Sequence, residues 1–162
     1  MTPEYSHTQK SPLCLLIYAL AILFASVGFV FEDFPQIPWL FPPIGIVLLA
    51  IAASFHHLPV EDQGDVLVIR FGPLPLFQRT VRYANIASAE VGRTTLLDGW
   101  GIHYSLRGGW VWNVWGRDCI VVHFKNGGRL SVGTDDAKSL AEFLRRKVES
   151  PFRPSGTNHR PD

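Results

Sequence analysis

The feature that most constrains the fold is a pair of long apolar runs near the N-terminus. Leu13–Phe31 and Ile37–Phe55 contain no charged residue. A helix of about 20 apolar residues can span the ~30 Å hydrocarbon core of a bilayer. Because only residues 32–36 separate the runs, they predict a transmembrane helical hairpin over residues 13–57, preceded by an N-terminal tail of residues 1–12.

Each run has an alternative interpretation. The first run resembles the apolar part of a cleaved signal peptide with Lys10 as its charged region, but no small-residue cleavage motif follows it. In the second run, Pro38, Pro42 and Pro43 lack amide donors and disturb a helix interior, so the regular helix is predicted to start near Pro43. That helix would end at His57 and would be short, which leaves a re-entrant or tilted segment open beside a full span.

Charges flanking the runs predict their orientation. Lys10 and Arg70 lie on the outer sides of the hairpin, whereas the connection carries Glu32 and Asp33 and no basic residue. The positive-inside rule then predicts a multi-pass protein of the inner cell membrane with both termini in the cytoplasm. Membrane lipid is therefore one expected partner.

The rest of the chain has a mild charge and no redox or metal pattern. The whole chain has a net charge of +1, and its basic residues are scattered. Nucleic-acid binders concentrate more positive charge on one face, so no nucleic-acid partner is expected. The two cysteines, Cys14 and Cys119, form neither a disulfide framework nor a metal motif.

Short alternating segments bounded by Gly, Pro or Asn predict seven strands after residue 60. Their expected ranges are 66–72, 76–82, 86–93, two strands of a ribbon within 98–118, 119–125 and 129–133. Asn126-Gly127-Gly128 predicts a tight hairpin turn. An amphipathic helix is expected over 135–148, with one apolar stripe formed by Leu140, Phe143, Leu144 and Val148. These elements predict one domain over 61–148 and a disordered polar tail over 149–162.

The ribbon DGWGIHYSLRGGWVWNVWGRD holds four of the five tryptophans. A three-residue loop, 107–109, would pair Leu106 with Trp110, Tyr104 with Trp112 and Ile102 with Val114. This register places nearly all large apolar residues on one face, whereas a two-residue loop would put large rings on a polar side. We therefore expect Trp110 and Trp112 in the core.

Two rings of the ribbon remain free for binding. Trp100 lies at its start, and Trp115 lies beside Gly116 and Arg117. Trp100, Trp115 and Arg117 are the candidate binding residues, although either ring can equally cover an end of the sheet.

The segment Gly99–Leu144, GWGIHY…GGWVWNVWGRDCIVVHFKNGGRLSVGTDDAKSLAEFL, resembles a family of small bacterial membrane proteins with a pleckstrin-homology-like (PH-like) domain. The resemblance implies an α+β membrane protein: a two-helix transmembrane hairpin, then a PH-like seven-stranded antiparallel barrel closed by a C-terminal amphipathic helix. It implies no activity. Domains of this type that bind phosphoinositides carry cations in the first strand-to-strand loop, whereas residues 72–77 here, GPLPLF, have none. That loop is expected either to touch an apolar surface or to form a tight turn.

No catalytic constellation is evident. His56 and His57 point about 100° apart on a helix, and His103 and His123 have no metal-ligand spacing. Asp135 and Asp136 suit a helix start better than an acid–base pair. We expect no enzyme activity, cofactor, catalytic or metal site, or small-molecule substrate. The expected function is a membrane-anchored module that binds a protein partner at the cytoplasmic face of the membrane, and the alternative is a module that senses lipid or the membrane surface.

Overall fold

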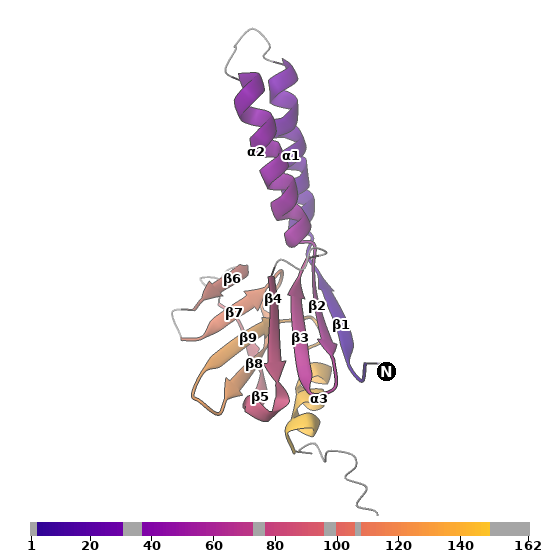
Figure 1. Ribbon diagram of the computed structural model, residues 1–162, viewed down its shortest axis with the longest axis vertical. Coiled ribbons are helices and arrows are strands. Elements are labelled where there is room, and N and C mark those ends of the chain that lie inside the picture. Colours follow the sequence, from indigo (N-terminus) through magenta and orange to yellow (C-terminus); the bar gives the residue numbers. More distant parts are fainter. Residues whose placement is uncertain (1–2, 31–36, 73–76, 96–99, 106–107, 150–162) are drawn as a thin grey trace, which may run out of the picture.

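The computed structural model describes residues 3–30, 37–72, 77–95, 100–105 and 108–149. Its elements in chain order are β1 (Ser6–Lys10), α1 (Leu13–Val30), α2 (Ile37–Ser54), β2 (His57–Asp62), β3 (Val66–Phe71), β4 (Phe77–Arg82), the 3₁₀ turn η1 (Tyr83–Asn85), β5 (Ile86–Arg93), β6 (Gly101–Tyr104), β7 (Trp110–Asn113), β8 (Asp118–Phe124), β9 (Arg129–Gly133) and α3 (Ala137–Glu149). Figure 1 shows the α1–α2 hairpin projecting from one end of the strands and α3 near the opposite end.

The helical hairpin is an insertion between two paired strands. β1 and β2 are antiparallel neighbours, with Lys10 opposite His57 and Ser6 opposite Glu61. The Ser11 amide continues this pairing by donating to the His56 carbonyl at 3.1 Å. Both ends of the hairpin are therefore anchored in one sheet, whose strand order is β1-β2-β3-β4.

Small residues let the two hairpin helices approach closely. A Cβ on Gly45 would lie 2.9 Å from the Ala21 carbonyl oxygen, and Ala21 and Ala52 are fully buried. Phe24 and Phe41 stack across the hairpin, with ring centroids 5.7 Å apart. Helix α2 begins at Ile37 and contains Pro42 and Pro43, so the predicted start near Pro43 is wrong. Pro42 and Pro43 are the sixth and seventh residues of α2, beyond the first four amides that have no acceptor within a helix, so each proline removes one helical hydrogen bond.

The predicted transmembrane hairpin is not supported. Among the described residues, no helix combines the length and the apolar character needed to cross a membrane. Helices α1 and α2 have 18 residues each, which corresponds to about 27 Å at 1.5 Å per residue. The prediction of a multi-pass inner-membrane protein with two cytoplasmic termini is corrected accordingly.

The predicted seven-stranded antiparallel barrel is also wrong, because the described residues form nine strands in two sheets of four and five. The second sheet has the order β5-β8-β9-β7-β6. Strands β7 and β9 pair in parallel, with Trp112 beside Val132, whereas the other pairs in this sheet are antiparallel. β1 and β2 were not expected, since SHTQK has no apolar alternation and HLPVED follows directly on an apolar helix.

One hydrophobic core lies between the two sheets and α3. Leu140, Phe143 and Leu144 are fully buried and Val148 packs at the core's edge, so the predicted apolar stripe is confirmed. Helix α3 contacts β5, β8 and η1. The Thr134 hydroxyl oxygen accepts a hydrogen bond from the Asp136 amide just before the helix begins. The tail predicted over 149–162 is wrong at its first residue, because Glu149 ends helix α3, and residues 150–162 lie outside the described residues.

The ribbon register differs from the prediction by two residues on one strand. Tyr104 lies opposite Trp110, and Ile102 lies opposite Trp112. Trp112 is buried, as expected, but Trp110 is 44% exposed. Val111 and Trp112 point to opposite faces of β7 and are both buried, and of the two only Trp112 belongs to the main core cluster. The prediction of a single apolar face therefore did not apply to β7.

Candidate interaction surfaces

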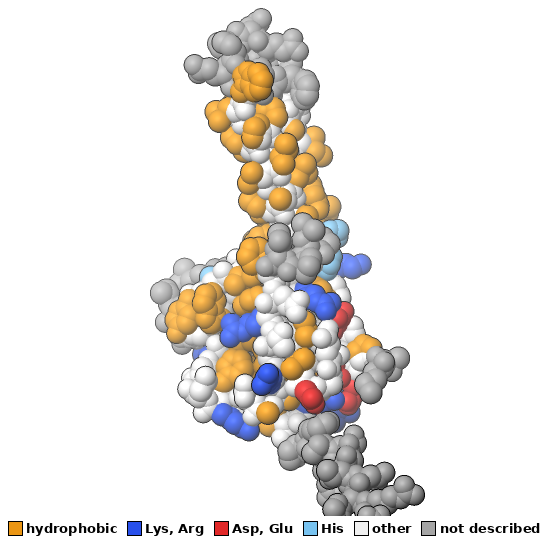
Figure 2. All heavy atoms as spheres, in the orientation of Figure 1, with side chains coloured by type: hydrophobic (Ala, Val, Ile, Leu, Met, Phe, Trp, Pro, Cys, Tyr) orange, Lys and Arg blue, Asp and Glu red, His pale blue; other side chains and the backbone are white. Residues whose placement is uncertain are grey.

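The α1–α2 hairpin carries a large exposed apolar surface. Side chains on both helices are exposed: Leu15, Leu16, Ile22, Leu23, Trp39, Leu40, Ile46 and Val47. Ile22 is 64% exposed and Ile46 is 66% exposed. Figure 2 shows hydrophobic side chains covering the visible face of helices α1 and α2, and the charged side chains coloured in this view lie below these helices. We call these eight side chains the hairpin surface.

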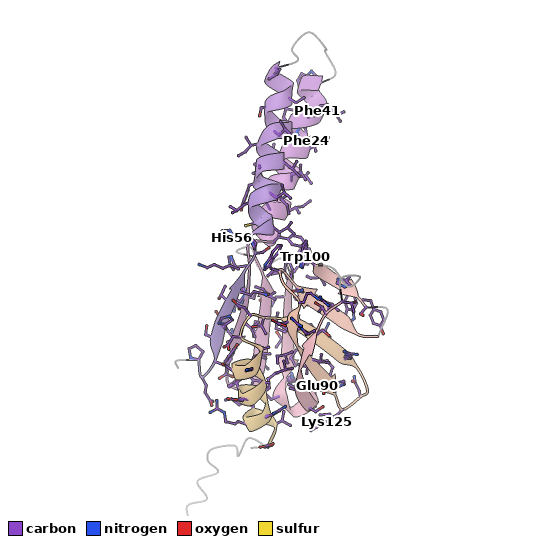
Figure 3. The ribbon with its side chains drawn as sticks, turned by 180° about the vertical axis from the view of Figure 1, so that it is seen from behind. Phe24, Phe41, His56, Glu90, Trp100 and Lys125 are labelled. Carbon is purple, nitrogen blue, oxygen red and sulfur yellow. The ribbon has the colours of Figure 1, made fainter. Side chains whose placement is uncertain are left out.

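Trp100 and Trp115 form a stacked pair near the foot of this surface. Their ring centroids are 4.8 Å apart and their planes differ by 22°. Both rings are partly exposed, at 46% and 37%. Figure 3 shows Trp100 close to His56, where the hairpin meets the strands. The structure thus brings together the two rings that the sequence singled out, although residues 96–99, just before Trp100, lie outside the described part.

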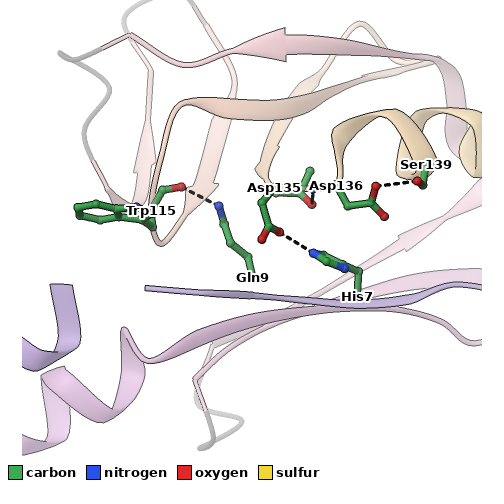
Figure 4. A network of polar contacts seen from close by, with 7 residues as sticks. His7, Gln9, Trp115, Asp135, Asp136 and Ser139 are labelled. Carbon is green, nitrogen blue, oxygen red and sulfur yellow. Dashed lines mark hydrogen bonds and ion pairs between the residues drawn. The ribbon is translucent and has the colours of Figure 1, made fainter. Parts of the chain in front are cut away.

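The turn that holds Trp115 is built around a fully buried asparagine. The Asn113 side chain accepts a hydrogen bond from the Trp115 amide and donates one to the Gly116 carbonyl. The Trp115 carbonyl in turn accepts a bond of 2.7 Å from the Gln9 side chain on β1 (Figure 4). This network fixes Trp115 relative to the strand that leads into α1. The tryptophan pair therefore lies at the end of the strands from which the hairpin projects.

Arg117 does not join the tryptophan pair. Its Nε donates to the Thr94 carbonyl at 3.4 Å, and its own carbonyl accepts bonds from the Thr94 amide and hydroxyl. In the described part of the chain, no cation–π contact links it to either ring. The hydrogen bonds between Arg117 and Thr94 extend the strand pairing beyond the β5–β8 ladder. Arg117 therefore has a structural role.

Aromatic contacts connect the foot of the hairpin to the core. Phe55 packs edge-on against Phe71 at 5.4 Å, and Phe71 does the same against Trp112 at 6.3 Å. A Cβ on Gly101 would lie 3.6 Å from the Phe55 ring. The orientation of the hairpin is therefore set by packing as well as by the β1–β2 pairing.

His57 is a partly buried titratable group at the foot of the hairpin. Burial lowers the pKa of His57, and the neighbouring His56 and Lys10 lower it further. The two histidine rings are 5.3 Å apart, and Lys10 is the cross-strand partner of His57. Like charges directly opposite each other on paired strands are destabilising. The fold therefore favours neutral His57.

This shift predicts a pH-dependent stability. Below about pH 6.5 the unfolded chain binds a proton at His57 that the folded chain takes up only at lower pH. We expect the contribution of His57 to be complete above pH 7 and to fall as the pH is lowered. Urea unfolding between pH 7 and pH 5 should show a smaller loss of stability in His57→Gln than in the wild type. An identical pH slope in both proteins would show that His57 is not responsible.

A second surface lies at the other end of the β6–β7 ribbon. Tyr104 and Trp110 are both exposed, and their rings meet edge-on at 6.0 Å. They line a groove together with Arg79 and Arg129. Sequence reasoning missed this surface because it assigned Trp110 to the core. The position of Trp110 directly after Gly108-Gly109, at the ribbon tip, was the available signal.

No protein-family model matches the chain, and no significant match to a curated protein was found. The resemblance to bacterial PH-like membrane proteins accordingly stays a prediction.

The remaining candidate features of the described residues are metal-ligating side chains, the two cysteines and one further cavity. Among the described residues, no three His, Cys, Asp or Glu side chains are grouped to hold a metal ion. Cys14 and Cys119 are both buried, and no disulfide joins them. A cavity of about 1070 Å³ lies beside the end of α3, and its wall includes Glu149, the last described residue. The predicted apolar loop, residues 73–76, lies outside the described residues.

Proposed function

We propose that this protein is a non-enzymatic docking module whose helical hairpin binds an apolar surface of another protein. The hairpin surface carries the proposal. It combines strongly exposed Leu, Ile and Val side chains with helices that contain no charged residue. An exposed apolar area of this kind marks an interaction site, and a helix that is apolar all round is normally covered.

The chemistry of the hairpin surface defines the partner. Because neither helix offers a charge, the partner surface must be largely apolar, as in an unpaired helix or helix pair. The Trp100–Trp115 stack adds two amphipathic rings near the foot, where such an interface would meet water. Tryptophan is enriched among the residues that dominate binding energy. The anchoring of the hairpin between β1 and β2 supports a preorganised docking element, which lowers the entropic cost of binding.

Site-specific photo-crosslinking followed by affinity measurement tests this proposal. A photoreactive residue at Ile22 or Ile46 should crosslink to one discrete protein, whereas the same residue at Val91 should not. Val91 is a matched control because it is a 50% exposed aliphatic side chain on β5. Its neighbour Glu90 lies far below the hairpin in Figure 3.

The crosslinked protein is then purified for binding measurements with variants. Ile22→Asn and Ile46→Asn should each raise its Kd about tenfold or more, because burying an isoleucine contributes roughly 1.5–3 kcal/mol. Val91→Asn should leave the Kd unchanged. Crosslinks from Ile22 that reach only lipid, or equal binding by all three variants, would contradict the proposal.

A further inference from the structure

The groove at the tip of the ribbon is a second binding site with its own chemistry. It has a volume of about 500 Å³ and lies between β4, the β6–β7 tip and the β8–β9 turn. None of its described lining residues is acidic, whereas Arg79 on β4 and Arg129 on β9 both line it. On the face seen in Figure 2, basic and apolar side chains lie side by side over the strands.

Arg79 is a partly buried cation that has no compensating acid among the described residues. Burial lowers the pKa of Arg79, and no carboxylate acts against this shift. Among the ion pairs of the described residues, none involves Arg79. A partly buried guanidinium with no counter-charge is unfavourable by itself and is stabilised when an anion binds.

Arg129 contributes an unused hydrogen-bond donor. Its Nε is buried and has no partner in the described structure. Buried donors are normally satisfied, so an orphaned guanidinium nitrogen beside a groove indicates a missing acceptor. The carboxylate of Glu90 does not fill this role, because it pairs with the His123 ring at 3.1 Å.

Exposed aromatic rings complete the groove. Tyr104 is 64% exposed, and Trp110 meets it edge-on. Exposed Trp and Tyr beside Arg is the residue combination that is enriched at the energetic centres of protein interfaces. The groove thus presents two positive groups and an aromatic surface within one open cavity.

We propose that this groove binds an acidic peptide segment, whose carboxylates engage Arg79 and Arg129 while an apolar side chain packs on Tyr104 and Trp110. The site is separate from the hairpin surface and goes beyond the proposed function. A peptide fits better than a nucleic acid, since the chain has a net charge of only +1 and two arginines do not form the basic stripe that a phosphate backbone requires.

Fluorescence anisotropy with the full chain tests the proposal. The probe is a fluorescein-labelled peptide of alternating glutamate and phenylalanine, compared with a matched peptide that has glutamine in place of glutamate. The acidic peptide should bind with a micromolar Kd, and the glutamine peptide should bind at least about tenfold more weakly. Arg79→Gln and Arg129→Gln should each weaken binding of the acidic peptide by about tenfold or more.

The matched control is Arg145→Gln, which removes the same charge from an exposed position on α3. It should leave the Kd unchanged. Tyr104→Ala removes an exposed ring and should also weaken binding; it keeps the test valid if Arg129→Gln lowers the melting temperature.

Three results would overturn the proposal. The first is no binding of the acidic peptide up to about 1 mM, far above the micromolar range expected. The second is equal binding by Arg79→Gln, Arg129→Gln, Tyr104→Ala and the wild type. The third is displacement of the peptide by inorganic phosphate or a single-stranded oligonucleotide at an equal or lower concentration, which would identify a phosphate site instead.

Discussion

Trp112→Ala should lower the free energy of unfolding by about 3–5 kcal/mol, the usual cost of removing a large aromatic side chain from a core. Trp112 is 7% exposed and belongs to the central cluster. It packs edge-on against Phe71, which in turn contacts Phe55 at the foot of the hairpin. Since small domains are stable by only about 5–15 kcal/mol, this single change should remove much of the stability.

Two further substitutions test whether this loss of stability comes from the burial and the ring volume of Trp112. Trp115→Ala should cost much less, because Trp115 is partly exposed and its truncation leaves no sealed cavity. Trp112→Phe should also cost less than Trp112→Ala: it keeps an aromatic ring and removes an indole Nε1 that is buried without a partner. Urea unfolding of the full chain gives the three values. A larger loss for Trp115→Ala than for Trp112→Ala would show that the ribbon packs differently.

Gly72→Ala should destabilise the protein by about 3 kcal/mol or more and should loosen the hairpin from the sheet. Gly72 has φ +73°, where an L-residue costs roughly 1–2 kcal/mol. A Cβ there would also lie 2.6 Å from the Ser54 Cα and 2.8 Å from the Ala53 carbonyl oxygen. These are backbone atoms at the end of α2, so no rotamer change can relieve the overlap, and overpacking adds about 1–3 kcal/mol.

Gly64→Ala is the matched control for Gly72→Ala. Gly64 has φ +82°, nearly the same backbone conformation, but its Cβ would meet no atom within 4 Å. It should therefore show only the conformational cost of roughly 1–2 kcal/mol. Thermal or urea unfolding measures both variants, and proteolysis within the hairpin reports its detachment. Equal losses for the two variants would mean that the close contact between β3 and α2 does not restrain the hairpin.

Elements with a strong local pattern could be predicted from the sequence. The turn at Asn126-Gly127-Gly128 joins β8 and β9, and Gly127 has φ +83° as such a turn requires. Helix α3 is amphipathic and buries the expected stripe. In both cases residues within a few positions of each other decide the conformation, so periodicity and turn chemistry are sufficient.

The candidate sites were only partly predictable. Trp100 and Trp115 were singled out as free rings, but their stacking depends on Asn113 and Gln9, which hold the turn of Trp115 against β1. The sequence places Trp110 at the ribbon tip but does not predict the groove around it, because Arg79 and Arg129 are distant in sequence and are brought together by two different sheets. The prediction that Trp110 is buried considered only the pairing of the two ribbon strands with each other.

By itself, the sequence determined the existence of two apolar helices, most strands of the domain and the C-terminal helix, since these follow from local periodicity. Only the tertiary structure decided that the polar segment Ser6–Lys10 is a strand, because its stability comes from pairing with β2 across the inserted hairpin. It likewise decided the ribbon register. β7 pairs with β6 on one edge and with the parallel strand β9 on the other, and it buries Val111 and Trp112 on opposite faces, whereas the alternating pattern of the ribbon alone predicts one apolar face.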